Sequence, residues 1–149
     1  MNTIHVEFGG IQLCVPQDWG EITATVEGAK APFTLAKNGG CGALQFSPAL
    51  YRSGRFPNFT FTKIIALLQE FSANKHLNVG PVRTFGLGNM KFASADGLID
   101  RDRVRIWYCS DGANVVLVTY VHPALEQNEE LNQCEEIVRS VQFSRSGGE

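Results

Sequence analysis

The last third of the chain, from Val104 to Phe143, constrains the fold most strongly. Two apolar β patterns, Arg103–Cys109 and Asn114–Val121, flank a tight turn at Asp111-Gly112, which predicts an antiparallel hairpin. The second pattern is apolar on both faces, as expected for a central strand that is covered on both sides. An amphipathic helix follows it. This order predicts a compact α+β domain, and the region contains no constellation of reactive residues.

The preceding chain supplies further strand patterns. Strands are expected, in chain order, over Ile4–Phe8, Ile11–Val15, Glu21–Glu27, Pro32–Ala36, Ala43–Ser47, Val82–Phe85 and Lys91–Ile99. Gly9-Gly10 is typical of a hairpin turn between the first two strands, and Pro16 stops the second. A charged turn, Asp100-Arg101-Asp102, separates Lys91–Ile99 from the strand that follows it.

Two helices are expected. Thr60 or Thr62 can cap the first, whose buried face is predicted to comprise Phe61, Ile64, Ile65, Leu68 and Phe71. This helix should fade over 74–78, because Gly80-Pro81 prevents its continuation. The apolar stripe of the second helix is predicted to comprise Leu131, Cys134, Ile137, Val138 and Val141, after acidic residues at its start, Glu126, Glu129 and Glu130.

Length and charge limit the classes of protein. The 149 residues suit one domain, expected over 1–143, with 144–149 as a flexible tail. A net charge of −2 disfavours nucleic acid and anionic membranes as partners. The first residues alternate like a strand and lack a basic leader, and no window approaches the roughly 18 apolar residues of a membrane span. We therefore expect a cytoplasmic protein without a membrane partner.

Two short motifs resemble a known family. The opening Ile11–Trp19, a strand followed by Pro16 and Trp19, is similar to the start of the PsbP/DcrB-like superfamily. The ending Ile137–Phe143 resembles the closing "I-x-x-S-x-x-F" of the same group. The resemblance covers most of the chain in element order. It implies a mostly antiparallel sheet flanked by two main helices, an α/β/α sandwich, in a group that mostly acts in binding or assembly without catalytic residues.

The four cysteines show no metal-site spacing. None forms a CxxC pair, so no metal or other cofactor is predicted. Cys14 and Cys109 lie in strand patterns and Cys134 on a helical stripe, and we expect all three to be buried reduced thiols.

Cys41 carries the sharpest local signal for chemistry. It lies in the loop Gly39-Gly40-Cys41-Gly42, where small neighbours permit the approach of a substrate. A catalytic thiolate would also need a base, and His5, His76 and His122 are the only histidines. None of them lies in a recognised Cys-His motif. A tightly turned loop entering the next strand is the favoured interpretation, with a cysteine-dependent enzyme as the alternative.

Two charged groups receive structural interpretations. The carboxylates Asp96, Asp100, Asp102 and Asp111 do not match an EF-hand, and solvated turns with cross-strand charge pairs explain them better. Arg103, Arg105 and Trp107 share one face of their strand, a pattern typical either of a partner surface or of a strand's exposed side.

A long segment without periodicity, residues 48–59, gives the most plausible contact surface. It holds Tyr51, Arg52, Arg55 and Phe56, and such residue types are enriched at protein interfaces. Phe56 and Phe59 can instead anchor the segment onto the core. We predict that Tyr51, Arg52, Arg55 and Phe56 bind a partner protein.

The leading functional hypothesis is a non-enzymatic protein-binding module. Within that class, a bacterial immunity-like protein that neutralises a toxin by direct binding is favoured, since an acidic chain suits a basic toxin. An envelope or photosystem-type assembly factor is the second binding hypothesis. A small enzyme using Cys41 is the rival from another class.

Overall fold

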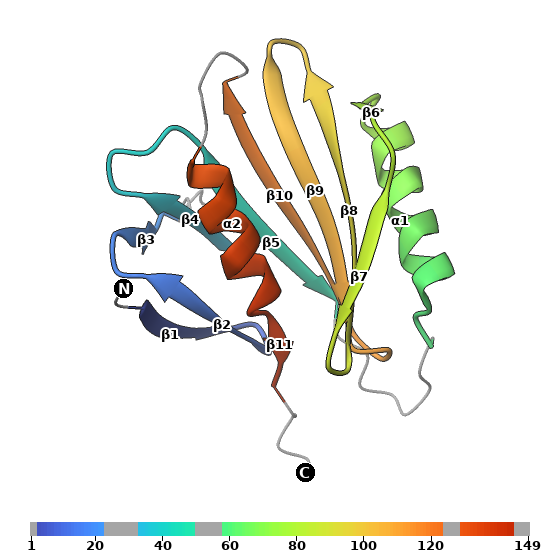
Figure 1. Cartoon of the computed structure of the whole chain (residues 1–149), viewed down its shortest axis with the longest axis horizontal. Helices are drawn as coiled ribbons and strands as arrows, with labels where there is room; N and C mark the ends of the chain where they lie inside the picture. The colour runs from blue at the N-terminus through green and yellow to red at the C-terminus, as the bar shows by residue number, and fades with distance from the viewer. Residues whose placement is uncertain (1–2, 23–32, 50–57, 124–128, 145–149) are drawn as a thin grey trace, which may run out of the picture.

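The computed structural model describes residues 3–22, 33–49, 58–123 and 129–144 (Figure 1). The described elements are β1 (Thr3–Phe8), β2 (Ile11–Pro16), β3 (Trp19–Glu21), β4 (Phe33–Lys37), β5 (Ala43–Ala49), α1 (Phe61–Asn74), β6 (Asn78–Val79), β7 (Arg83–Leu87), β8 (Met90–Ile99), β9 (Asp102–Ser110), β10 (Val115–Pro123), α2 (Glu130–Arg139) and β11 (Gln142–Phe143). Neither described helix has the length and apolar character needed to cross a membrane.

All described strand pairs are antiparallel. The large sheet has the order β3-β4-β5-β10-β9-β8-β6, with β7 also paired to β8, and a small sheet has the order β1-β2-β11. In the large sheet β10 pairs with β5 on one side and with β9 on the other. Its central position confirms the prediction made from its apolar character on both faces.

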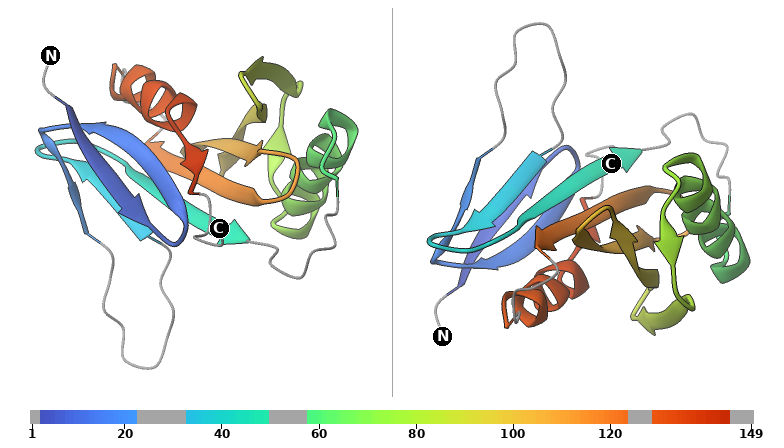
Figure 2. Two further views of the ribbon diagram at one scale, coloured as in Figure 1. Left: turned by 90° about the horizontal axis from the view of Figure 1, so that it is seen from below. Right: turned by 90° about the horizontal axis from the view of Figure 1, so that it is seen from above.

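The two helices cover opposite faces of the large sheet (Figure 2). Alternation along β9 shows the division: Ile106 is buried in the core beneath α1, whereas Trp107 is buried in the core beneath α2. We call these the α1 face and the α2 face. The predicted α+β sandwich, a mostly antiparallel sheet with two main helices, is confirmed.

The small sheet packs on the α2 face, beside α2. Its strand β2 is paired with β11, which follows α2 directly. Phe8 of β1 stacks on Phe33 of β4 with 3.6 Å between ring centroids, and Phe46 of β5 meets Phe8 edge-on at 5.6 Å. These rings join the two sheets into one core.

Helix α1 begins with the predicted cap. The Thr60 hydroxyl accepts a hydrogen bond from the Lys63 amide, so it caps the helix as predicted. Ile64 and Leu68 are buried. The expected burial of Phe61 is wrong: this residue is 37% exposed. Side chains of a helix lean toward its N-terminus, and Phe61, the first residue of α1, has no preceding helical turn beside it.

Several strand predictions are confirmed with small shifts, and others change. The β1–β2 hairpin turns at Gly9-Gly10, both in the left-handed region. The short strand β6 was not predicted. The strand expected over Glu21–Glu27 falls mostly outside the described residues, which place only β3 near its beginning.

Two burial predictions on strands are wrong for a shared reason. Cys14 is exposed, because only alternate residues of β2 face the core and Cys14 lies between the buried Leu13 and Val15. The face carrying Arg105 and Trp107 is not an open strand surface, since Trp107 is fully buried under α2. Single-strand alternation does not show which face a helix later covers.

Candidate functional site

The four predicted partner-binding residues, Tyr51, Arg52, Arg55 and Phe56, lie outside the described residues. The described chain fixes where their segment starts and ends. Ala49 at the end of β5 is paired with Val115, and the Phe59 amide donates a hydrogen bond of 2.8 Å to the Gly112 carbonyl oxygen. Phe59 is itself buried, which confirms its role as an anchor on the core. Both ends of the segment therefore lie beside the β9–β10 turn.

The loop that holds Cys41 is closed by a carboxylate from α2. Glu130, the first residue of α2, is only 7% exposed. Its Oε1 accepts the Cys41 amide at 3.1 Å, its Oε2 accepts the Gly42 amide at 3.2 Å, and Oε2 also accepts the Tyr120 hydroxyl. Charge-assisted hydrogen bonds of this kind are stronger than neutral ones. The backbone amides that could have formed an anion or oxyanion site are thus occupied by the protein's own side chain.

The glycines of this loop are required by close packing. A Cβ at Gly42 would lie 2.6 Å from Tyr120 Cε1 and 2.6 Å from the Val121 carbonyl oxygen. A Cβ at Gly40 would overlap the Glu130 carboxylate. Real side chains do not tolerate such distances. The motif is a loop that enters β5, as the favoured interpretation predicted, and its glycines are required by contact with β10 and α2.

The Cys41 thiol is exposed, and its Sγ lies 3.8 Å from the Tyr120 hydroxyl oxygen. His122 stacks on Tyr120 at 5.2 Å between ring centroids, and its Nδ1 lies 3.1 Å from the Pro123 carbonyl oxygen. Among the described residues, no hydrogen bond joins a histidine to Cys41. The geometry therefore lacks the thiol–imidazole pair that nucleophilic cysteine chemistry uses.

Cys109 in β9 and Cys134 in α2 are buried, as predicted. Burial and the nearby Glu135 carboxylate raise the pKa of the Cys109 thiol well above its ordinary value. Burial, followed by the charge of Glu130, likewise raises the pKa of Cys134. Both thiols are held in their neutral form, which is the unreactive form of cysteine.

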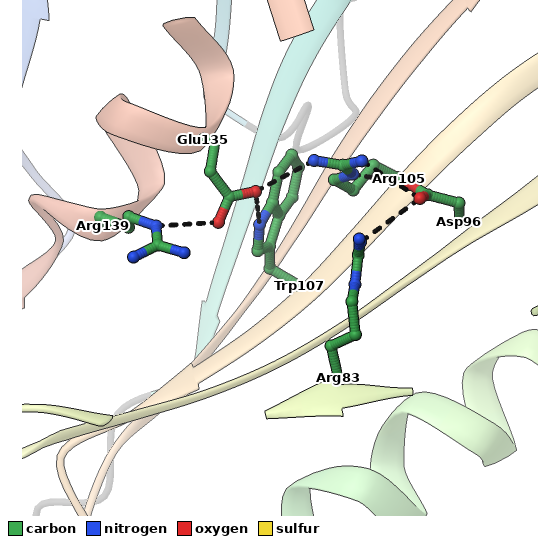
Figure 3. A network of polar contacts seen from close by, with 6 residues as sticks. All are labelled: Arg83, Asp96, Arg105, Trp107, Glu135 and Arg139. Atoms are coloured by element: carbon green, nitrogen blue, oxygen red, sulfur yellow. Dashed lines mark hydrogen bonds and ion pairs between the residues drawn. The ribbon is translucent and has the colours of Figure 1, made fainter. Parts of the chain in front are cut away.

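A network of charged and aromatic side chains links α2 to the β8–β9 hairpin and to β7 (Figure 3). We call it the arginine network, and its members are Arg83, Asp96, Arg105, Trp107, Glu135 and Arg139. Arg105 is its centre. The Arg105 guanidinium donates to both oxygens of Asp96, at 2.6 and 3.1 Å, and to Glu135 Oε1 at 3.1 Å. One side chain thereby joins the hairpin to the helix.

Burial in this network is graded. The side chains of Arg105 and Glu135 are 16% and 20% exposed, whereas those of Arg83, Asp96 and Arg139 are about half exposed, at 53%, 52% and 46%. Partial burial acts to lower the pKa of Arg105, but hydrogen bonds and charges from Asp96 and Glu135 together outweigh it and raise that pKa. The centre of the network is therefore a fixed positive charge.

Glu135 also binds Trp107, the buried aromatic member of the network. Its Oε1 accepts the indole N–H of the fully buried Trp107 at 3.2 Å, and its Oε2 accepts Arg139 Nε at 3.1 Å. The Arg139 guanidinium in turn lies 4.0 Å from the centroid of the Phe85 ring, a cation–π contact with β7. The outer arginine is thus held by a carboxylate on one side and by a ring on the other.

Two of the four carboxylates singled out in the sequence, Asp96 and Asp111, have structural roles. Asp96 forms the predicted cross-strand pair with Arg105 and also binds Arg83 Nη2 at 3.3 Å. Asp111 accepts the Ala113 and Asn114 amides and so closes the β9–β10 turn. In the part of the chain that the structure describes, no group of His, Cys, Asp or Glu is arranged to hold a metal ion.

Sequence reasoning missed the arginine network as a unit, although two of its links were visible. A turn centred on Asp100-Arg101 places Asp96 opposite Arg105, and Glu135 and Arg139 are four residues apart on one helix. The contact between α2 and the β8–β9 hairpin joins segments about 30 residues apart, so no local sequence pattern indicates it.

Comparison with known proteins agrees with this fold. No protein-family model matches the sequence, and no curated protein matches it at the sequence level. The structure is similar to cyanobacterial PsbP (CyanoP) from Synechocystis sp. PCC 6803, with a TM-score of 0.63 and 8% identity over 95% of this chain and 92% of that one. It is also similar to a mutant of the protein Mog1, with a TM-score of 0.60 and 10% identity over 98% of both chains. The Saccharomyces cerevisiae Ran-binding protein Mog1p gives a TM-score of 0.58 and 10% identity over 96% of both chains. The chain has the α+β sandwich fold that PsbP and Mog1 share.

Proposed function

We propose that this protein is a non-enzymatic module that binds another protein. The observation that carries the proposal is the arginine network. Its outer arginines, Arg83 and Arg139, are about half exposed, and Arg139 is supported by the Phe85 ring. Arginine and aromatic residues dominate the energetics of protein interfaces. A fold shared with the Ran-binding protein Mog1p supports the same class of function.

The arrangement around Cys41 favours binding over the rival enzyme. A cysteine nucleophile needs a base and free hydrogen-bond donors near the sulfur. Here Glu130 accepts the amides of Cys41 and Gly42, and the sulfur lies against the Tyr120 hydroxyl. These contacts serve the packing of the loop against α2.

Two kinds of partner remain in contention. The immunity-like role, in which the protein neutralises a toxin by direct association, is supported by a net charge of −2 that would attract a basic protein. The assembly-factor role is supported by the fold shared with CyanoP. A toxin-like reading frame next to the gene favours the first, and an upstream leader sequence favours the second.

We propose Tyr51, Arg52, Arg55 and Phe56 as the partner-binding residues. The described residues that flank them, Ala49 and Phe59, lie beside the β9–β10 turn, which supports a contact surface at that end of the sheet. Two exposed apolar side chains lie in the neighbouring elements, Phe61 at the start of α1 and Leu87 at the end of β7, at 37% and 42% exposure. Exposed apolar side chains near arginine are typical of contact surfaces.

The test uses the purified full chain as bait, identifies captured protein by mass spectrometry, and measures the affinity of the purified pair by calorimetry. Tyr51→Ala with Arg55→Ala should leave folding unchanged and weaken the complex by about tenfold or more. Ile99→Ala with Arg101→Ala, at the opposite end of β8, is the matched control and should leave the affinity unchanged.

Three outcomes count against the proposal. No specific partner from the cognate cell would remove the binding function, and equal affinity of both double variants would remove the loop as its site. A catalytic activity that is lost on alkylation of Cys41 and in Cys41→Ala would establish the enzyme instead.

A further inference from the structure

Strand β7 is an open edge of the large sheet. Along Arg83–Leu87 it pairs with β8 on one side, and among the described residues no strand pairs with its other side. Four of its five residues are exposed, with Phe85 partly covered beneath Arg139. An edge of this kind offers unpaired backbone amides and carbonyls to an added strand.

The arginine network, which includes Arg83 of β7, carries more positive than negative charge. The arginine network sets three arginines against two carboxylates, an excess of one positive charge in a chain of net charge −2. The net charge of the network is therefore opposite in sign to that of the whole chain.

The outer arginines have donors to spare. Arg83 uses one terminal nitrogen on Asp96, and Arg139 uses its Nε on Glu135. Among the described residues their remaining N–H groups have no acceptor. Arginine presents its N–H groups in a planar fork that matches a carboxylate with two parallel hydrogen bonds.

We propose that β7 and the arginine network together dock an extended acidic segment of the partner protein. The segment adds alongside β7, and its carboxylates bind the outer N–H groups of Arg83 and Arg139. This inference rests on the proposed protein-binding function and specifies the chemistry of its partner. The five residues of β7, preceded by Pro81, limit the added strand to about the same length.

The network is organised before the partner arrives. Asp96 and Glu135 hold the guanidiniums by hydrogen bonds, and the Phe85 ring supports Arg139 from below. Less side-chain entropy is then lost on binding than with free arginines. The two carboxylates also disfavour a run of phosphates, because fixed negative charges lie between the arginines, so a peptide fits this surface better than a nucleic acid.

The charge of the whole partner does not decide this contact. Charges separated by more than a Debye length of about 8–10 Å are largely screened in physiological salt. A partner that is basic overall can therefore present a short acidic segment here. The immunity and assembly roles both accommodate it.

The experiment titrates the isotope-labelled full chain with a defined probe, an end-capped eight-residue peptide of alternating glutamate and valine, and follows binding by nuclear magnetic resonance. Amide shifts should be confined to β7 and its neighbours, together with the Nε–H signals of Arg83 and Arg139. The same peptide with glutamine in place of glutamate, or with alternate N-methylated amides, should bind about tenfold more weakly or not at all.

The protein variants separate charge at this site from charge in general. Arg83→Gln with Arg139→Gln should weaken the glutamate peptide by about tenfold. Lys75→Gln with Arg101→Gln removes the same charge from exposed positions elsewhere and should change the affinity by less than about twofold. Urea unfolding of each variant checks that the fold is kept.

Several results would overturn the inference: equal binding of the glutamine peptide, shifts centred on another surface, or a β7-mediated dimer of this chain that excludes the probe. If a captured natural partner binds the wild type and Arg83→Gln/Arg139→Gln equally, the protein-binding function stands and this surface does not. If the probe docks at β7 and the cell yields no protein partner, the surface stands and the proposed function does not.

Discussion

Replacing Glu130 by glutamine tests the idea that an internal carboxylate, not a ligand, occupies the Cys41 loop. The carboxylate accepts two backbone amides, from Cys41 and Gly42, and the hydroxyl of Tyr120. Glutamine has nearly the same shape but one acceptor oxygen and an NH2 group. In Glu130→Gln the NH2 group must face at least one donor, and the remaining bond loses its charge.

The expected loss follows from the number of bonds. A hydrogen bond to a charged group contributes about 1.5–3 kcal/mol, and a neutral one about 0.5–1.5 kcal/mol. Because glutamine keeps one acceptor and Tyr120 can reorient toward the NH2 group, the three contributions are not lost in full. We expect Glu130→Gln to lower the free energy of unfolding by about 2–4 kcal/mol.

The assay is urea unfolding followed by the fluorescence of Trp19 and Trp107, both of which are buried. Hydrogen exchange of the Cys41 and Gly42 amides supplies a local readout and should become faster in Glu130→Gln. Glu129→Gln is the control, because Glu129 is exposed and makes no side-chain cap bond, and it should change stability by less than about 0.5 kcal/mol.

The reasoning is refuted if Glu130→Gln matches the control in stability and leaves both amides protected. In that case contacts other than the Glu130 carboxylate would hold the loop and protect its two amides.

Three further predictions address packing and ionisation. Gly42→Ala should lower the free energy of unfolding by about 1–3 kcal/mol because its Cβ overlaps β10, whereas Gly20→Ala, with nothing within 4 Å, should be near neutral by the same urea assay. Burial raises the pKa of Tyr108 to about 12, so stability from this group is present below the unfolded-state value of about 10 and is lost as the pH rises toward 12; comparison of the phenolate absorbance of wild type and Tyr108→Phe against pH checks this, and a normal titration contradicts it. A thiol reagent should modify Cys14 and Cys41 in the native protein and all four cysteines after unfolding; rapid modification of more than two native thiols would show that the core opens.

Much of the fold follows from local sequence rules. The Gly9-Gly10 turn, the Thr60 cap and the apolar character of β10 on both faces each depend on a few consecutive residues, and all three predictions are confirmed. Short-range sterics and hydrogen bonding determine such features before any distant contact forms.

Burial of individual side chains depended on packing between distant segments. The alternation of a strand separates its two faces without saying what covers each. The sequence therefore predicts neither the burial of Trp107 under α2 nor the exposure of Cys14. Phe61 has the spacing of a buried residue, yet it is the first residue of α1 and has no preceding helical turn to cover it.

The sequence by itself determined the strand and helix order, the turns and the fold class, since these follow from periodicity and turn chemistry. Only the tertiary structure placed Glu130 against the Cys41 loop and Glu135 against Arg105, across separations of 89 and 30 residues. The physical reason is that a carboxylate on a helix can bind any donor that the packing brings to it, and no local pattern records which donor that is.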